Sequence, residues 1–185
     1  HWLVAIACIA VIVFLNYSLI SNWFVGEFSQ NMGSIEISYI QMAKSWAEGG
    51  SLWRQWWYFG HPWHVFYTPL LPTLEVLLHN IFDFSYAHAY RVVTGVGYIF
   101  VPASVFLFVW QISKSKTGAF VAALAYSFLP SIIALLFPEV AADTLSGSME
   151  PRRFAIMVRW GEGPHTLALA FIPLFGVFLS RYLVK

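Results

Sequence analysis

Four long apolar stretches limit what this chain can fold into. A transmembrane helix needs about 20 largely apolar residues to cross the hydrocarbon core of a bilayer. The stretches that meet this need are Trp2–Ile20, Ala89–Ile112, Gly118–Phe137 and Thr166–Leu183. Each contains Gly, Pro or Ser, which helices in lipid tolerate better than helices in water. The sequence therefore predicts an all-α integral membrane protein with about four transmembrane helices, forming one transmembrane domain over residues 1–185.

The composition supports this class and excludes others. Hydrophobic residues make up 59% of the chain and charged residues 10%, against about 25% charged residues in a soluble domain. The net charge of +1 provides no basic field for nucleic acid.

The chain begins at His1 and ends at Lys185 directly after an apolar run, so we expect a fragment of a longer protein. A removed signal peptide is an alternative explanation for the start.

Basic residues orient the predicted spans. Lys114 and Lys116 occupy a very short loop without an acidic residue, and Arg181 and Lys185 flank the last stretch. Two spans separate these groups, so both lie on the same side, and the positive-inside rule makes that side cytoplasmic. The loop at about 138–165 is then external, and the whole of about 21–88 is external as well if no further span lies within it.

The segment "FGHPWHVFYTPLLPTLEVLLH" is apolar enough to suggest a fifth span. However, Pro69 and Pro72 each lack a backbone donor, and Glu75 in lipid costs about 2.5–3.5 kcal/mol. Glu75 lies four residues before His79, so the two share a helical face and we expect them to pair. We therefore place 64–82 at the outer interface. The alternative, a fifth span, would put 22–63 in the cytoplasm.

A short amphipathic helix is predicted in "NMGSIEISYIQMAKSWAEGG". Its apolar stripe consists of Ile35, Tyr39, Met42 and Trp46, at spacings of four, three and four. Lys44 and Glu48 form an i,i+4 pair on another face. Glu36 lies in the first turn, where the helix dipole favours a carboxylate. A purely structural role at the helix start is the simplest interpretation of Glu36.

The order of these features resembles a known superfamily. An acidic residue in the first loop is followed by "FYTPLLP" and then by "AYRVVTGVGYIFVPASVFLFVWQISKSKTGAFVAALAYSFLPS". This resembles the N-terminal part of bacterial membrane proteins of the GT-C glycosyltransferase superfamily. It is most similar to the group called 6-pyruvoyl-tetrahydropterin synthase-related membrane proteins, a label that does not imply pterin chemistry. The resemblance runs from about residue 33 to 173.

The resemblance implies a transferase that uses a polyprenyl-phosphate-linked sugar at the outer face of the bacterial cytoplasmic membrane. It implies that the carboxylate of Glu36 acts as general base or metal ligand. A divalent cation, held by oxygen ligands, is the cofactor it suggests, and the ligand candidates in the second loop are Glu139, Asp143 and Glu150. Guanidinium groups match phosphate oxygens, so the candidates for the leaving group are Arg152, Arg153 and Arg159. In the superfamily the first-loop acid is usually Asp, often followed by His, whereas "SIEISY" has Glu36 and no His.

Two other interpretations remain open at the level of sequence. The first is a non-catalytic accessory subunit packed in a larger membrane protein complex, contacting pigments or lipids. Histidines at the span ends (His61, His64, His88 and His165) are either ligands of such pigments or interfacial anchors. In the second, "EPRRF" is a solvated loop whose charges pair at the surface. Membrane lipid is an expected partner in every case.

Overall fold

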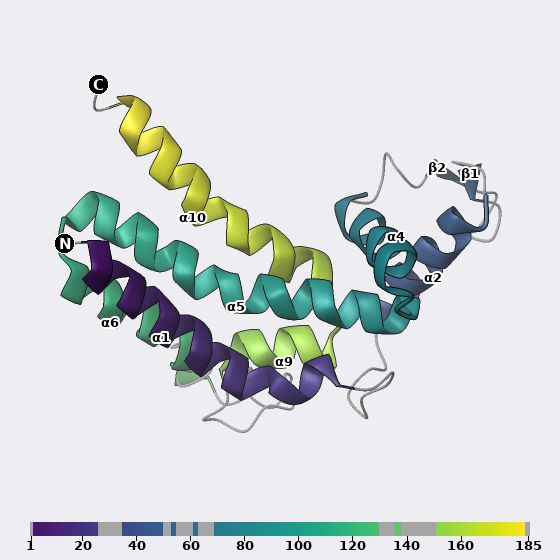
Figure 1. Cartoon of the computed structure of the whole chain (residues 1–185), viewed down its shortest axis with the longest axis horizontal. Coiled ribbons are helices and arrows are strands. Elements are labelled where there is room, and N and C mark those ends of the chain that lie inside the picture. The colour runs from purple at the N-terminus through teal and green to yellow at the C-terminus, as the bar shows by residue number, and fades with distance from the viewer. Residues whose placement is uncertain are drawn as a thin grey trace.

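The computed structural model describes residues 2–25, 35–49, 69–129 and 151–183, with the short segments 53–54, 61–62 and 136–137. Within these residues the chain is almost entirely helical (Figure 1). The elements are α1 (Trp2–Ile20), the 3-10 turn η1 (Ser21–Phe24), α2 (Glu36–Ala47), β1 (Trp53–Arg54), β2 (His61–Pro62), α4 (Leu70–Phe82), α5 (Tyr86–Ser113), α6 (Lys116–Phe128), α9 (Arg152–Arg159) and α10 (Gly163–Leu183). The strands β1 and β2 form one antiparallel pair of two residues each.

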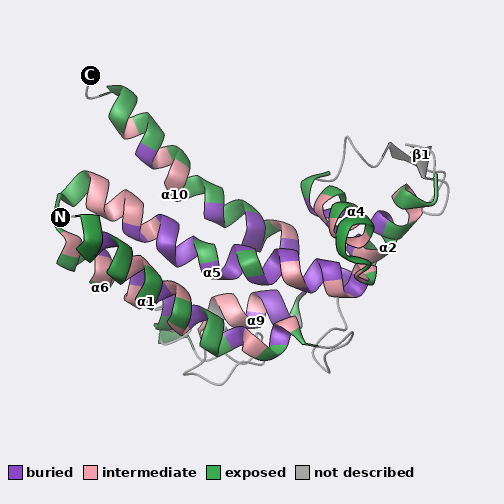
Figure 2. Ribbon diagram, viewed as in Figure 1, coloured by how far each residue is buried: buried purple, intermediate pink, exposed green. Residues whose placement is uncertain are grey.

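Helix α5 is the centre of the structure. Its most apolar stretch is 61% buried, whereas those of α1 and α10 are each 22% buried, so these two helices cover α5 and turn most of their surface outward (Figure 2). The ring of Trp2 lies 5.1 Å from that of Trp110, and Trp23 Nε1 donates to Thr94 Oγ1 at 3.2 Å. The start of α1 is therefore beside the end of α5, and the two helices run antiparallel.

Helices α1 and α6 run side by side and parallel. Asn16 Nδ2 on α1 donates to Ser127 Oγ on α6 at 3.0 Å, between two otherwise apolar faces. The turn between α5 and α6, residues 113–116, contains both lysines of the short loop and is called the lysine turn below. Ser115 caps α6 by accepting from the backbone of Gly118, and Lys114 ends α5 with a left-handed φ of 57°.

Helix α10 packs along α5 in the same direction. A Cβ atom on Gly97 would lie 3.1 Å from Cα of Leu167, so the two backbones meet closely there. Further along, a Cβ on Gly176 would lie 2.6 Å from the ring of Phe108. The helices then diverge toward the C-terminus (Figure 1).

Three helices of the described chain are long and apolar enough to span a membrane, namely residues 2–24, α5 and α10. They correspond to the first, second and fourth predicted stretches. The third, 118–137, begins as α6, but residues 130–135 lie outside the described part of the chain, so its full length stays a prediction. The described helices agree with a membrane protein.

The segment 64–82 contains α4, which has 13 residues. A helix of this size is about 20 Å long, shorter than the hydrocarbon core of about 30 Å. Leu71 and Glu75 on its inner face are buried, while Leu70 and Ile81 are exposed. Helices α2 and α4 both pack against the first part of α5, at the end away from the lysine turn (Figure 1). These features favour an interfacial helix over a fifth span.

Candidate functional site

Glu36 begins α2 and is only 1% exposed. Its neighbour in space is the turn between α9 and α10. Gly161 has a left-handed φ of 66°, and a Cβ added there would lie 2.7 Å from the backbone N of Glu36 and against its Oε2 atom. A side chain at 161 would therefore displace the carboxylate. Glycine at this position lets the first and second loops meet at Glu36.

Tyr90 of α5 is fully buried beside this contact. Its hydroxyl donates to the carbonyl of Gly161 at 2.7 Å, and a Cβ on Gly163 would lie 2.7 Å from the same hydroxyl. The start of α10 is thus fixed against α5 directly next to Glu36. We call Glu36, Tyr90 and the turn 161–163 the loop junction.

Glu75 of α4 is also buried, and neither of its carboxylate oxygens has a hydrogen-bond partner among the described residues. Burial raises the pKa of Glu75 well above its ordinary value. The expected pairing with His79 is wrong. His79 Nδ1 is hydrogen-bonded to the carbonyl oxygen of Phe84 at 2.6 Å, and its ring stacks on Tyr86 at 4.4 Å. The helix ends at Phe82, one turn after His79, so the carbonyl of Phe84 just beyond its end competes with the carboxyl group for the imidazole.

The turn after α9 carries a second polar pair. His165 Nδ1 lies 2.5 Å from Glu162 Oε2, and the imidazole is largely exposed. This pair is next to Gly161 and Gly163 in the chain and therefore at the edge of the loop junction. The sequence pattern "GEGPH", with two glycines around an acid, was the signal that could have identified it.

Arg153 lies apart from Glu36. Its guanidinium carbon is 3.6 Å from the centre of the Tyr98 ring and 5.2 Å from that of Tyr126, and Nη2 donates to the carbonyl of Tyr98. Its Nη1 atom has no hydrogen-bond partner within the described chain. Burial lowers the pKa of Arg153 from its ordinary value. Tyr98 is two helical turns beyond Tyr90, so Arg153 is about 12 Å further along α5.

The other predicted site residues are less fully described. Arg152 and Arg159 lie on α9, but their side chains are outside the described part of the structure, as are Glu139, Asp143 and Glu150 entirely. Among the residues that are described, no group of three His, Cys, Asp or Glu side chains is placed to hold a metal ion. The predicted cation site is therefore still a prediction.

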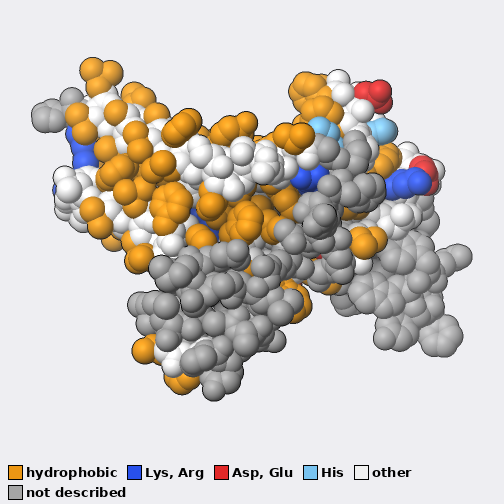
Figure 3. Space-filling view, turned by 90° about the horizontal axis from the view of Figure 1, so that it is seen from below, with side chains coloured by type: hydrophobic (Ala, Val, Ile, Leu, Met, Phe, Trp, Pro, Cys, Tyr) orange, Lys and Arg blue, Asp and Glu red, His pale blue; other side chains and the backbone are white. Residues whose placement is uncertain are grey.

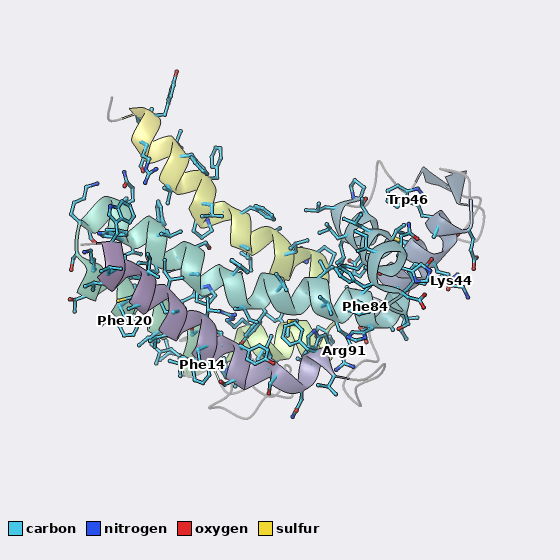
Figure 4. The ribbon with its side chains drawn as sticks, viewed as in Figure 1. Phe14, Lys44, Trp46, Phe84, Arg91 and Phe120 are labelled. Carbon is cyan, nitrogen blue, oxygen red and sulfur yellow. The ribbon has the colours of Figure 1, made fainter. Side chains whose placement is uncertain are left out.

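Arg91 is a buried cation that the sequence reasoning missed. It is 2% exposed, donates from Nη2 to the carbonyl of Asn22 at 2.9 Å, and lies over the Trp23 ring at 5.1 Å. Figure 4 shows it pointing from α5 to the end of α1. An arginine in the first turn of the predicted span 89–112 was its signal in the sequence. Its contacts indicate that it joins η1 to α5.

In comparisons with models of protein families, with curated proteins and with solved structures, the chain matches none of them.

Proposed function

We propose that this chain is the N-terminal part of a GT-C-like glycosyltransferase that uses a polyprenyl-phosphate-linked sugar at the outer face of a bacterial cytoplasmic membrane. The observation that carries the proposal is the loop junction. The carboxylate of the first external loop and the turn of the second one meet at Glu36, at the end of the bundle away from the lysine turn. The resemblance expects a reactive carboxylate in the first loop, and this contact supports the choice of Glu36 for that role.

In the proposed reaction, Glu36 accepts the proton of an acceptor hydroxyl. The hydroxyl oxygen forms a bond to the anomeric carbon of the sugar as the bond from that carbon to the phosphate oxygen breaks. The polyprenyl phosphate leaves with the electron pair. Arginines of α9 balance its charge. Arg159 ends α9 two residues before Gly161, so it is the candidate on the side of Glu36, whereas Arg153 packs on Tyr98 about 12 Å further along α5.

The test is a sugar-transfer assay on the intact protein, comparing wild type with Glu36→Gln at matched expression. The substitution keeps the size of the side chain and removes the base, so we expect a loss of about 10²–10⁴-fold in rate. The matched control is Glu48→Gln. Glu48 ends the same helix, is 64% exposed and pairs with Lys44 at 4.0 Å, so its loss should leave the rate unchanged.

Full activity in Glu36→Gln would eliminate the proposed role of this carboxylate. A wild-type protein without transferase activity that purifies with a stable membrane complex would instead favour the accessory subunit.

A further inference from the structure

A groove runs between α5 and α10 from the middle of the bundle to the lysine turn. Its first part is a cavity of about 390 Å³, with residues of α5, α10 and α1 as its walls. Apolar side chains dominate this part, including Val96, Phe100, Leu107, Leu167, Phe171 and Leu174. The one hydroxyl in the wall, that of Ser104, already donates to the carbonyl of Val101 at 2.7 Å. This part of the groove therefore suits a hydrocarbon chain.

The groove continues into a second cavity of about 390 Å³, which shares Leu107 and Leu174 with the first. The walls of this second cavity become polar and basic toward the end of the groove. The residues there are Trp110, Gln111, Lys114 and Arg181. Lys114 and Arg181 are both exposed. The groove thus has an apolar body and a cationic end.

Nothing acidic in the surrounding helices competes for these two cations. All nine acidic residues of the chain lie within 27–83 or 139–162, and none is part of α1, α5, α6 or α10. Figure 3 shows basic side chains at the left-hand end of one face and hydrophobic side chains along its body, with the acidic side chains at the right, where further basic ones lie beside them. The charge at the end of the groove is available to an external anion.

The length of the groove fits one lipid leaflet. From Leu167 to Arg181 along α10 is about 21 Å. Half of a bilayer, including its headgroup region, measures about 20–22 Å. A lipid with its headgroup at Lys114 and Arg181 would therefore extend one acyl chain to the point where α10 meets Gly97.

We propose that this groove is a binding site for one anionic phospholipid of the cytoplasmic leaflet. The phosphate lies between Lys114 and Arg181, and one acyl chain fills the cavity between α5 and α10. Cationic pockets between helices at the cytoplasmic side of a membrane have the chemistry that recognises such headgroups. The site is at the opposite end of the bundle from Glu36 and does not depend on the transferase function.

Native mass spectrometry tests this on the intact protein, incubated with equal amounts of phosphatidylglycerol and phosphatidylcholine of the same acyl chains. We expect wild type to retain one phosphatidylglycerol in preference to phosphatidylcholine. The double variant Lys114→Gln/Arg181→Gln should reduce that preference by roughly 10–30-fold. Both side chains are exposed, so the variant should fold. Lys44→Gln, which removes an exposed cation at the other end, is the control and should leave the preference unchanged.

A second variant tests the hydrocarbon part. Leu174→Trp fills the region that the two cavities share, so it should reduce retention of both lipids, with folding checked by its elution profile. Equal retention of the two lipids by wild type would overturn the proposal, as would an unchanged preference in the double variant. Displacement of phosphatidylglycerol by an equal amount of polyprenyl phosphate would assign the groove to the carrier lipid and overturn it as well.

Discussion

The carboxyl group of Glu75 is buried on α4 without a hydrogen-bond partner in the described chain, and its pKa is raised by burial. The folded protein therefore holds a proton that the unfolded chain releases at lower pH. The contribution of Glu75 to the free energy of unfolding is highest below the ordinary pKa of a glutamate. It falls by about 1.4 kcal/mol per pH unit as the pH rises from that value toward the raised pKa of Glu75. Above the raised pKa it levels off.

Glu75→Gln should remove this pH dependence, because glutamine keeps the shape of the protonated acid and does not ionise. We expect the variant to match wild type near pH 4 and to exceed it in unfolding temperature near pH 8. Thermal unfolding in detergent between these values measures the difference. Glu48→Gln, at an exposed position, is the control with no expected change. Identical pH profiles for wild type and Glu75→Gln would show that the group is not buried as described.

The sequence predicted the contacts of some single residues and not those of others. It identified Glu36 as a helix-start acid and the Lys44–Glu48 pair, because both depend on neighbours within four residues. It failed for His79, whose partner Phe84 lies beyond the end of the helix. It also gave no indication that Gly161 would contact Glu36, since a contact between distant loops leaves no periodic pattern in the chain.

At the level of elements, the close contact between α5 and α10 depends on Gly97. A larger side chain there would meet the backbone of Leu167, which cannot rotate away as a side chain can. Gly97→Leu should therefore separate the helices and destabilise the protein by about 1–3 kcal/mol, as overpacking does in general. Val96→Leu is the control on the same turn, because Val96 is 42% exposed. Unfolding temperatures of the two variants check this, and equal values would contradict the close contact.

The helices themselves were largely predictable because their apolar stretches exceed what a soluble fold can bury. The first residues of these helices were harder to predict. Helix α5 begins at Tyr86, before the predicted start at 89, because Ser85 accepts from the backbone N–H of His88 and caps it. Helix α10 begins at Gly163, before the predicted start at 166.

At the level of the whole molecule, the arrangement of α1, α5, α6 and α10 places the lysine turn and Arg181 together at one end. Ser85 and Ser115 are exposed serines at opposite ends of α5. Each is the N-cap of a helix, so the two cysteine variants lose the same kind of interaction and form a matched test of the orientation of α5. With Cys8→Ala as background, we expect Ser85→Cys to react with an impermeant thiol reagent added outside intact cells. Ser115→Cys should react only after the membrane is opened. The reverse pattern would invert the topology and move Glu36 to the cytoplasm.

The contact of Gly161 with Glu36 also has a consequence for how the protein is made. More than a hundred residues separate the two positions, and translation at about 5–20 residues per second needs on the order of ten seconds to cover that distance. During this interval the nascent chain already contains α2 and α4, while the turn that packs on Glu36 has yet to be synthesised. A ribosome that stalls before residue 161 would leave Glu36 without the turn that covers it.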